Sequence, residues 1–290
     1  MDISSYTSLF SKNLASLGIT GSFSPTRLLV PVTDTDATFH TTTHLHVKIA
    51  AYIAQATGAE FFLLSVDSTD PLSMEPTAVR ERFISDDELE SASISDQFPD
   101  VYGRDGSKRI ATAVAHHDID ALCLPSQSSM SSVRRITRTP AERIAATVDC
   151  DTIVLNGKWM TGPVSSILLP VAGGPHSGMA LALAEYLAEE TGAWIDLLHV
   201  TESESDADTR RAEAFLEDAA ALLTTTDRYD TWVIDSLDVP ATIIDQSSYY
   251  DLTILGAPTS GLLKQFIFGS TTNEIRTEID NAVLMVKSNA

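Results

Sequence analysis

A glycine-containing segment close to residue 260 joins a strand-like run, a loop and a helix start in an order that suits an anion. Gly256 ends an apolar run, and Gly269-Ser270-Thr271 precedes a stretch with helical spacing. A glycine at the carboxyl end of a parallel strand lets the backbone approach a ligand closely, and amides and hydroxyls at a helix N-terminus bind phosphate. The segment alone does not exclude turn glycines and a plain N-cap at Ser270 or Thr271.

Two more predicted strands end at the same edge of the sheet as Gly256. Val171-Ala172-Gly173-Gly174 follows one apolar run, and Val200 ends another. Open α/β sheets bind ligands outside the carboxyl ends of their strands, where all three segments would meet. We therefore favour a phosphate-binding site over isolated turns.

The elements that must position these residues occur twice in the chain. Helical stretches in both halves end in Thr-Gly-Ala, with Gly58 and Gly192 placed as C-caps. In the last forty residues of each half the register is kept at a constant offset of 131. The matching segments are 28–32 and 167–171, 46–57 and 179–191, 60–66 and 194–200, 120–124 and 251–255, and 151–155 and 282–286.

This repetition predicts the α/β class, with two tandem Rossmann-like domains. Strands alternate with helices in each half, which favours a mostly parallel five-stranded sheet with helices on both faces. We expect an N-terminal extension at residues 1–25, a first domain at 26–160 and a second domain at 161–290, divided by a segment rich in glycine and proline.

The sequence resembles the universal stress protein family in its tandem form. The resemblance covers about residues 27–156 and 164–288, and it is carried by Leu-Leu-Pro-Val at the first strand of the second half, Leu-Leu-His-Val at the next, the glycine loop and the closing Val-Leu-Met-Val-Lys. It implies the adenine nucleotide alpha hydrolase-like fold and binding of ATP or AMP, with or without Mg²⁺. It also implies that the contact between the two domains uses residues 152–155 and 283–286.

The ATP-binding pattern of that family is Gly-x2-Gly-x9-Gly-Ser/Thr. Gly256 and Gly269 keep its outer spacing of 13, whereas the middle glycine falls on Thr259 and Gly261 comes two positions later. Ala172 stands where nucleotide-binding members usually carry an aspartate. The implied contacts are Val171 and Val200 beside the base, Gly256, Gly269, Ser270 and Thr271 at the phosphates, and Ala172, Thr259 and Gly261 as the remaining site residues.

The first half has the same fold pattern with a degenerate site. Pro125 replaces the first loop glycine, Met130 takes the place of Gly261, and Arg138-Thr139 replaces Gly269-Ser270. A proline and a bulky side chain remove the close approach of the backbone. We expect nucleotide binding in the second half alone.

Composition excludes some function classes. The net charge of −21 opposes tight nucleic-acid binding, which depends on Lys and Arg neutralising phosphates. Asp outnumbers Glu 25 to 15 and Arg outnumbers Lys 13 to 6, which indicates halophilic adaptation. Two cysteines without ligand spacing, and no apolar run long enough for a membrane span, favour a cytoplasmic protein.

Other candidate groups have simpler structural explanations. We expect the histidines at 40, 44 and 46 to lie at a surface or helix start, Cys123 to be an inert core residue and Cys150 to be more exposed. The acidic run at 202–208 should be a solvated loop. Gly173-Gly174-Pro175-His176-Ser177 resembles the Ser-Gly-Gly-x-Asp-Ser loop of ATP pyrophosphatases, but Ser177 as a helix cap beside a tight glycine turn is the simpler expectation.

We predict a regulatory module that binds ATP or AMP in the second domain, in a stress response or in control of a partner such as a membrane transporter. Any hydrolysis would be slow, because the sequence offers neither a general base nor a metal ligand for it. One alternative is a nucleotide-free interaction or scaffold module, and another is an adenylating enzyme built on residues 173–177. The two halves would form an internal pseudo-dimer, with higher homo-oligomers left open.

Overall fold

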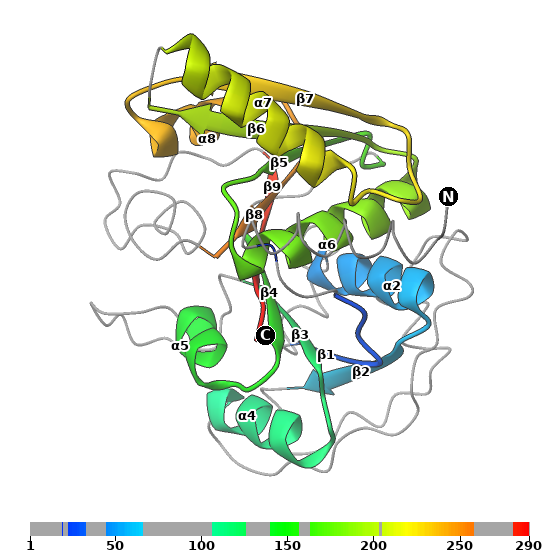
Figure 1. Cartoon of the computed structure of the whole chain (residues 1–290). Coiled ribbons are helices and arrows are strands. Elements are labelled where there is room, and N and C mark those ends of the chain that lie inside the picture. The colour runs from blue at the N-terminus through cyan, green and yellow to red at the C-terminus, as the bar shows by residue number, and fades with distance from the viewer. Residues whose placement is uncertain are drawn as a thin grey trace, which may run out of the picture.

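The computed structural model of the chain describes residue 19 and residues 23–32, 45–65, 106–125, 140–156, 163–202, 205–257 and 281–289. Within these ranges nine strands form a single sheet in the order β2-β1-β3-β4-β9-β8-β5-β6-β7 (Figure 1). Every neighbouring pair is parallel except β4 and β9. The strands are β1 Arg27–Val32, β2 Glu60–Ser65, β3 Ala121–Pro125, β4 Asp151–Asn156, β5 Ser166–Pro170, β6 Trp194–Thr201, β7 Tyr229–Asp235, β8 Leu252–Gly256 and β9 Ala282–Lys287.

Six described helices cover the two faces of the sheet, so the expected α/β class is confirmed. One apolar core lies between the sheet and α2, α6 and α7, and the other lies between the sheet and α4, α5 and α8. Strands buried on both faces are mainly apolar, as in the fully buried run of β9 before its final lysine. The helices are α2 Leu45–Thr57, α4 Gly106–His116, α5 Pro140–Thr147, α6 Pro175–Thr191, α7 Asp206–Ala220 and α8 Val239–Ser247.

The two halves meet at the centre of the sheet. β4 pairs with β9 in antiparallel register from Thr152 opposite Lys287 to Asn156 opposite Val283, so the contact expected between the final strands is confirmed. Beside this junction α2 and α6 pack against each other (Figure 1). The side chain of Gln55 donates a hydrogen bond to Glu190 across that helix pair (2.5 Å).

Small polar details recur at equivalent places in the two halves. Gly58 and Gly192 adopt φ angles of +71° and +73° directly after α2 and α6, as the predicted C-caps require. The threonine before each glycine donates its hydroxyl to the carbonyl four residues back, at 2.7 Å from Thr57 and 2.6 Å from Thr191. The repeated Thr-Gly-Ala sequence therefore builds the same helix end twice.

An aspartate also performs the same task in each half, at the amino end of the sheet. Asp120 accepts hydrogen bonds from the backbone amides of Thr26 and Arg27 at the start of β1, and from the Thr26 hydroxyl (2.6 to 3.0 Å). Asp251 accepts from the amides and hydroxyls of Ser165 and Ser166 at the start of β5 (2.6 to 3.2 Å). Each carboxylate ties the start of a central strand to the strand beside it.

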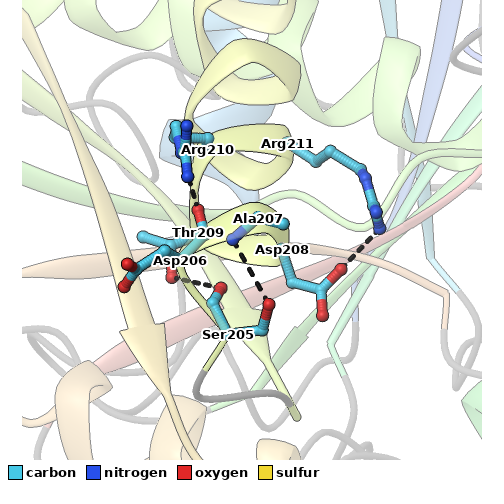
Figure 2. Close-up of polar contacts among 7 residues, drawn as sticks. All are labelled: Ser205, Asp206, Ala207, Asp208, Thr209, Arg210 and Arg211. Carbon is cyan, nitrogen blue, oxygen red and sulfur yellow. Dashed lines mark hydrogen bonds and ion pairs between the residues drawn. The ribbon is translucent and has the colours of Figure 1, made fainter.

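Helix α7 covers β6 and β7 from one side, and Figure 2 shows how it begins. The Ser205 hydroxyl accepts a hydrogen bond from the Ala207 amide (3.3 Å), and Arg211 pairs with Asp208 (2.5 Å). Asp206 and Asp208 lie in the first turn, where the helix dipole favours acids. The expectation of a solvated loop at 202–208 is therefore wrong for these two residues, because they start a helix.

Some of the predicted features fall on residues that the structure does not describe, or describes only in part. Of residues 1–25 the structure describes residue 19 and residues 23–25, where Phe23 is buried and its carbonyl accepts a hydrogen bond from the Tyr186 hydroxyl (2.7 Å). The first half contributes four described strands, and the fifth one expected would fall at residues outside the described ranges. No helix among the described residues is long and apolar enough to span a membrane.

Candidate functional site

The sheet opens between β5 and β8 at their carboxyl ends. The β5–β6 ladder runs to Pro170 opposite Leu198, but the β5–β8 ladder ends at Leu168 opposite Thr253. Because the next amide, that of Val171, donates to β6 (2.8 Å), the nitrogen of Pro170 faces β8, and proline has no hydrogen to donate there. β5 lies between β6, to which the chain continues next, and β8, which comes later in the chain. The strand order therefore reverses at β5, and open α/β sheets bind ligands at such a switch point.

The turn after β5 is held firmly to β6. The Val171 amide donates to the Leu198 carbonyl, and the Val171 carbonyl accepts a hydrogen bond from Nδ1 of His199 (2.8 Å). The His199 ring also packs against Phe215 of α7, with ring centroids 5.1 Å apart. His199 is half-buried, and its hydrogen bond fixes the backbone that leads into Ala172.

The structure does not bring the side chains of Val171 and Val200 together. Val171 belongs to the core under α6 and α7, whereas Val200 packs on the core beneath α8. The two valines therefore lie on opposite faces of the sheet. Ala172 is exposed at the end of β5, next to the opening.

Two glycines turn the chain from β5 into α6. Gly173 and Gly174 have φ angles of +82° and +89°, which other residues rarely adopt, so the expected tight glycine turn is confirmed. Gly174 is the N-cap of α6 and Pro175 its first residue. The sequence suggested Ser177 as the cap of this helix, and that expectation is wrong. Ser177 lies inside the first turn and donates its hydroxyl to the Gly173 carbonyl (2.8 Å).

The first turn of α6 lies directly against Gly256 at the end of β8. A Cβ atom on Gly256 would lie 3.1 Å from Cβ of His176 and 3.5 Å from its carbonyl carbon. This glycine therefore has a packing reason to be there, in addition to any approach of a ligand. Sequence reasoning missed the contact because the two residues are 80 positions apart.

His176 also links the opening to the junction of the two halves. Its Nδ1 accepts a hydrogen bond from the Ser288 amide just after β9 (3.1 Å). Burial, with a further contribution from the nearby Lys287 ammonium, lowers the pKa of His176 below 6.5, against the opposing charge of Asp151. Asp151 in turn accepts from the Asn289 amide (2.8 Å). The neutral imidazole is the form that can accept from an amide.

Five of the predicted site residues lie outside the described part of the chain. They are Thr259, Gly261, Gly269, Ser270 and Thr271. In the first half Pro125 ends β3, while Met130, Arg138 and Thr139 are outside the described ranges, as are His40 and His44. His46 is the second residue of α2, so the expected position at a helix start holds for it; its side chain is buried, and its Nε2 lies 3.1 Å from the Pro31 carbonyl oxygen.

The cysteines lack the exposure and the lowered pKa that mark reactive thiols. Cys123 and Cys150 are both buried, and burial raises the pKa of each thiol to about 12. The expectation for Cys123 is confirmed, whereas that of a more exposed Cys150 is wrong. Among the described residues no three His, Cys, Asp or Glu side chains gather in a way that could hold a metal ion.

A cavity of about 170 Å³ lies between α8 and the sheet. Its lining residues are Leu168, Leu198, Trp232, Ile234, Gln246 and Tyr250. Sequence reasoning missed this cavity. The available signal was β7, which places Trp232 and Ile234 on one face of a strand that carries Asp230 and Asp235.

The family comparison matches the second half of the chain. Residues 164–287 match the model of the Universal stress protein family, and these residues therefore contain a domain of that family. A search of curated proteins finds no match. The matched segment includes the opening between β5 and β8 and the turn after β5.

Solved structures of similar fold span nearly the whole chain. A universal stress protein from Archaeoglobus fulgidus has a TM-score of 0.53 at 14% identity, covering 91% of this chain and 97% of its own. A putative universal stress protein from Pseudomonas aeruginosa has a TM-score of 0.52 at 15% identity, with coverages of 91% and 94%. The cytoplasmic domain of a prokaryotic cation chloride cotransporter has a TM-score of 0.55 at 12% identity, with coverages of 91% and 95%. At these identities the likeness concerns the fold.

Proposed function

We propose that the chain is a tandem of two universal-stress-like domains, residues 26–160 and 161–290, that form an internal pseudo-dimer. The order β2-β1-β3-β4 mirrors β6-β5-β8-β9 about the antiparallel junction. The paired Thr-Gly-Ala helix ends and the paired aspartates at the strand starts support the same division. A repeat that keeps such local detail is expected when both halves derive from one folding unit.

We further propose that the second domain binds ATP or AMP, with or without Mg²⁺, and that this binding regulates a stress response or a partner protein such as a membrane transporter. The observation that carries the proposal is the opening at the switch point, where β5 and β8 separate beside a double-glycine turn. Gly256, Gly269, Ser270 and Thr271 would hold the phosphates, and Ala172, Thr259 and Gly261 would complete the site. Backbone amides must supply the attraction, because the half with the glycine loop carries 6 basic and 20 acidic residues.

A nucleotide-free interaction module is the second candidate, and one contact favours it. Gly256 is required by the close approach of His176, so its presence does not depend on a ligand. Ala172 is a further point in its favour, since it supplies no side-chain hydrogen bond to a base or ribose. The two candidates differ in one measurable property, which is affinity for adenine nucleotides.

Calorimetric titration of ATP and AMP in molar KCl tests the proposal. Wild type should bind, and Gly269→Asp should lose binding because the new carboxylate repels phosphate. Ala172→Asp should bind about tenfold more tightly, since a hydrogen bond to a charged group contributes about 1.5–3 kcal/mol. Ala172 is exposed, so this substitution brings no packing conflict.

Ala207→Asp is the matched control. It introduces the same charge at an exposed alanine in the first turn of α7, away from the opening, and should leave nucleotide affinity unchanged. Absence of binding in both wild type and Ala172→Asp would overturn nucleotide binding and leave the interaction module. Equal binding by wild type and Gly269→Asp would remove the glycine loop from the site.

A further inference from the structure

Exposed large apolar side chains gather in one region of the described chain. They are Trp194, Trp232, Leu237 and Tyr249, with exposed fractions between 46% and 87%, and all of them lie in the sequence between the start of β6 and the start of β8. Scattered exposed apolar residues need no explanation, but a concentration of aromatic ones in one region marks an interaction site.

The face of β7 that carries Trp232 is incompletely covered. β7 is the last strand of the sheet, and α7 packs on one of its faces. On the other face α8 packs against β5 and β6, further from the edge (Figure 1). Trp232 and Ile234 border the cavity on this side, together with Gln246 and Tyr250 of the α8 region.

The cavity is shaped for one apolar side chain. Its volume of about 170 Å³ resembles that of engineered apolar cavities that bind benzene. Leu168 and Leu198 supply its apolar floor from the sheet, and the aromatic rings of Trp232 and Tyr250 form walls. Aromatic anchor sites of this kind dominate the energy of protein interfaces.

A carboxylate holds one aromatic wall of the cavity, the Tyr250 side chain, in place. Asp196 accepts a hydrogen bond from the Tyr250 hydroxyl (2.7 Å) and another from Nε1 of Trp194 (3.2 Å). Side chains two residues apart on a strand point to the same face of the sheet, so those of Trp194, Asp196 and Leu198 all point to the face that α8 covers. A wall fixed before binding loses less conformational entropy when a partner docks.

The surroundings of the cavity are acidic. Residues 229–251, which comprise β7, α8 and the loops next to them, contain five aspartates and neither Lys nor Arg. A second copy docked through this surface would bring two sets of aspartates together, and such like-charge juxtaposition is unfavourable. A partner with basic residues around an apolar anchor would complement both the charge and the cavity.

We propose that the surface formed by Trp194, Trp232, Tyr249 and Tyr250, here called the β7 patch, binds a protein partner through a basic segment that inserts one apolar side chain into the cavity. The patch lies on the α8 face of the sheet, and its cavity extends inward from Trp232 on the edge strand to Leu168 of β5, the residue at which the β5–β8 ladder ends. This proposal does not depend on nucleotide binding.

A random peptide library displayed on phage is the probe, selected on the immobilised full chain without nucleotide and counter-selected on Trp232→Ala. Enriched peptides should place Lys or Arg around a Leu, Met or aromatic residue. A representative peptide should bind wild type at least tenfold more tightly than Trp232→Ala. Circular dichroism of the variant should be native, because Trp232 is half exposed and its loss leaves the core intact.

Leu237→Ala is the matched control. Leu237 is the most exposed of the four apolar residues and does not line the cavity, so its loss should leave peptide affinity unchanged. Asp245→Asn should weaken binding, more so in dilute than in molar salt. Enrichment of peptides without basic residues, or equal affinity for wild type and Trp232→Ala, would overturn the proposal. Self-association of wild type that Trp232→Ala abolishes in sedimentation velocity would do the same, because the occupant would then be a second copy.

Discussion

Replacing Gly256 by alanine separates the packing role of this residue from any role in binding. The new methyl group would meet Cβ of His176 at 3.1 Å, closer than carbon atoms normally approach. His176 cannot avoid it by changing rotamer, because Cβ moves only with the backbone of α6. The helix start must therefore shift by a few tenths of an ångström.

The expected loss of unfolding free energy is about 1–2 kcal/mol. Overpacking of a tight contact costs about 1–3 kcal/mol. Against this, alanine restricts the unfolded chain and stabilises the fold by about 0.4–1 kcal/mol, since Gly256 does not need a positive φ. Urea denaturation in molar KCl measures the difference as a lower midpoint at unchanged slope.

A double-mutant cycle with His176→Gly tests the cause. Removing Cβ from His176 eliminates the clash, so Gly256→Ala should cost little in that background and the coupling free energy should be about 1 kcal/mol or more. Zero coupling, or a Gly256→Ala variant as stable as wild type, would refute the packing explanation. Loss of nucleotide binding at unchanged stability would then assign Gly256 to the ligand.

Three further outcomes are expected. Asp251→Ala should lose about 1–3 kcal/mol of unfolding free energy at neutral pH in urea titrations. Burial alone would raise the pKa of Asp251, but its hydrogen bonds from Ser165 and Ser166 outweigh burial and lower the pKa below 3.8. The difference in unfolding free energy between wild type and variant should therefore be complete above about pH 4 and should shrink in stronger acid. His176→Asn keeps an acceptor for the Ser288 amide without titrating. Because the folded pKa of His176 lies below 6.5, wild type should lose stability relative to this variant as the pH falls below 6.5, seen as a growing difference in Tm. Cys123 and Cys150 should resist a thiol reagent in the native protein and react fully in urea, whereas rapid labelling of either in the native state would contradict their burial.

Much of the architecture could be predicted because its signals are local or repeated. Apolar runs ending in Pro-Val mark β1 and β5, and Thr-Gly-Ala marks the ends of two helices. The pairing of β4 with β9 was implied by the family resemblance. These features depend on nearest neighbours in sequence or on a repeat that shows itself twice.

Features of the candidate site that were missed depend on register between distant segments. Val171 directly follows β5, and Val200 lies near the end of the neighbouring β6. In the register of the two strands Val171 is level with His199, so the side chains of Val171 and Val200 point to opposite faces of the sheet. The contact of Gly256 with His176 requires knowing how far α6 descends towards β8. Ser177 was expected to be the N-cap, but the two positive-φ glycines place the cap at Gly174, three residues earlier, and the helix begins at Pro175.

The antiparallel junction at the centre of the sheet has a consequence for synthesis of the chain. β4 ends at Asn156 and its partner β9 begins at Ala282, so the ribosome must produce the whole segment between them before the ladder can form. During that interval β4 has a bare edge of backbone amides and carbonyls, a template for pairing with another nascent chain. Translation that pauses before residue 282 should therefore promote aggregation, and a destabilised β9 should lower the soluble yield more than a comparable change in β7 at the outer edge.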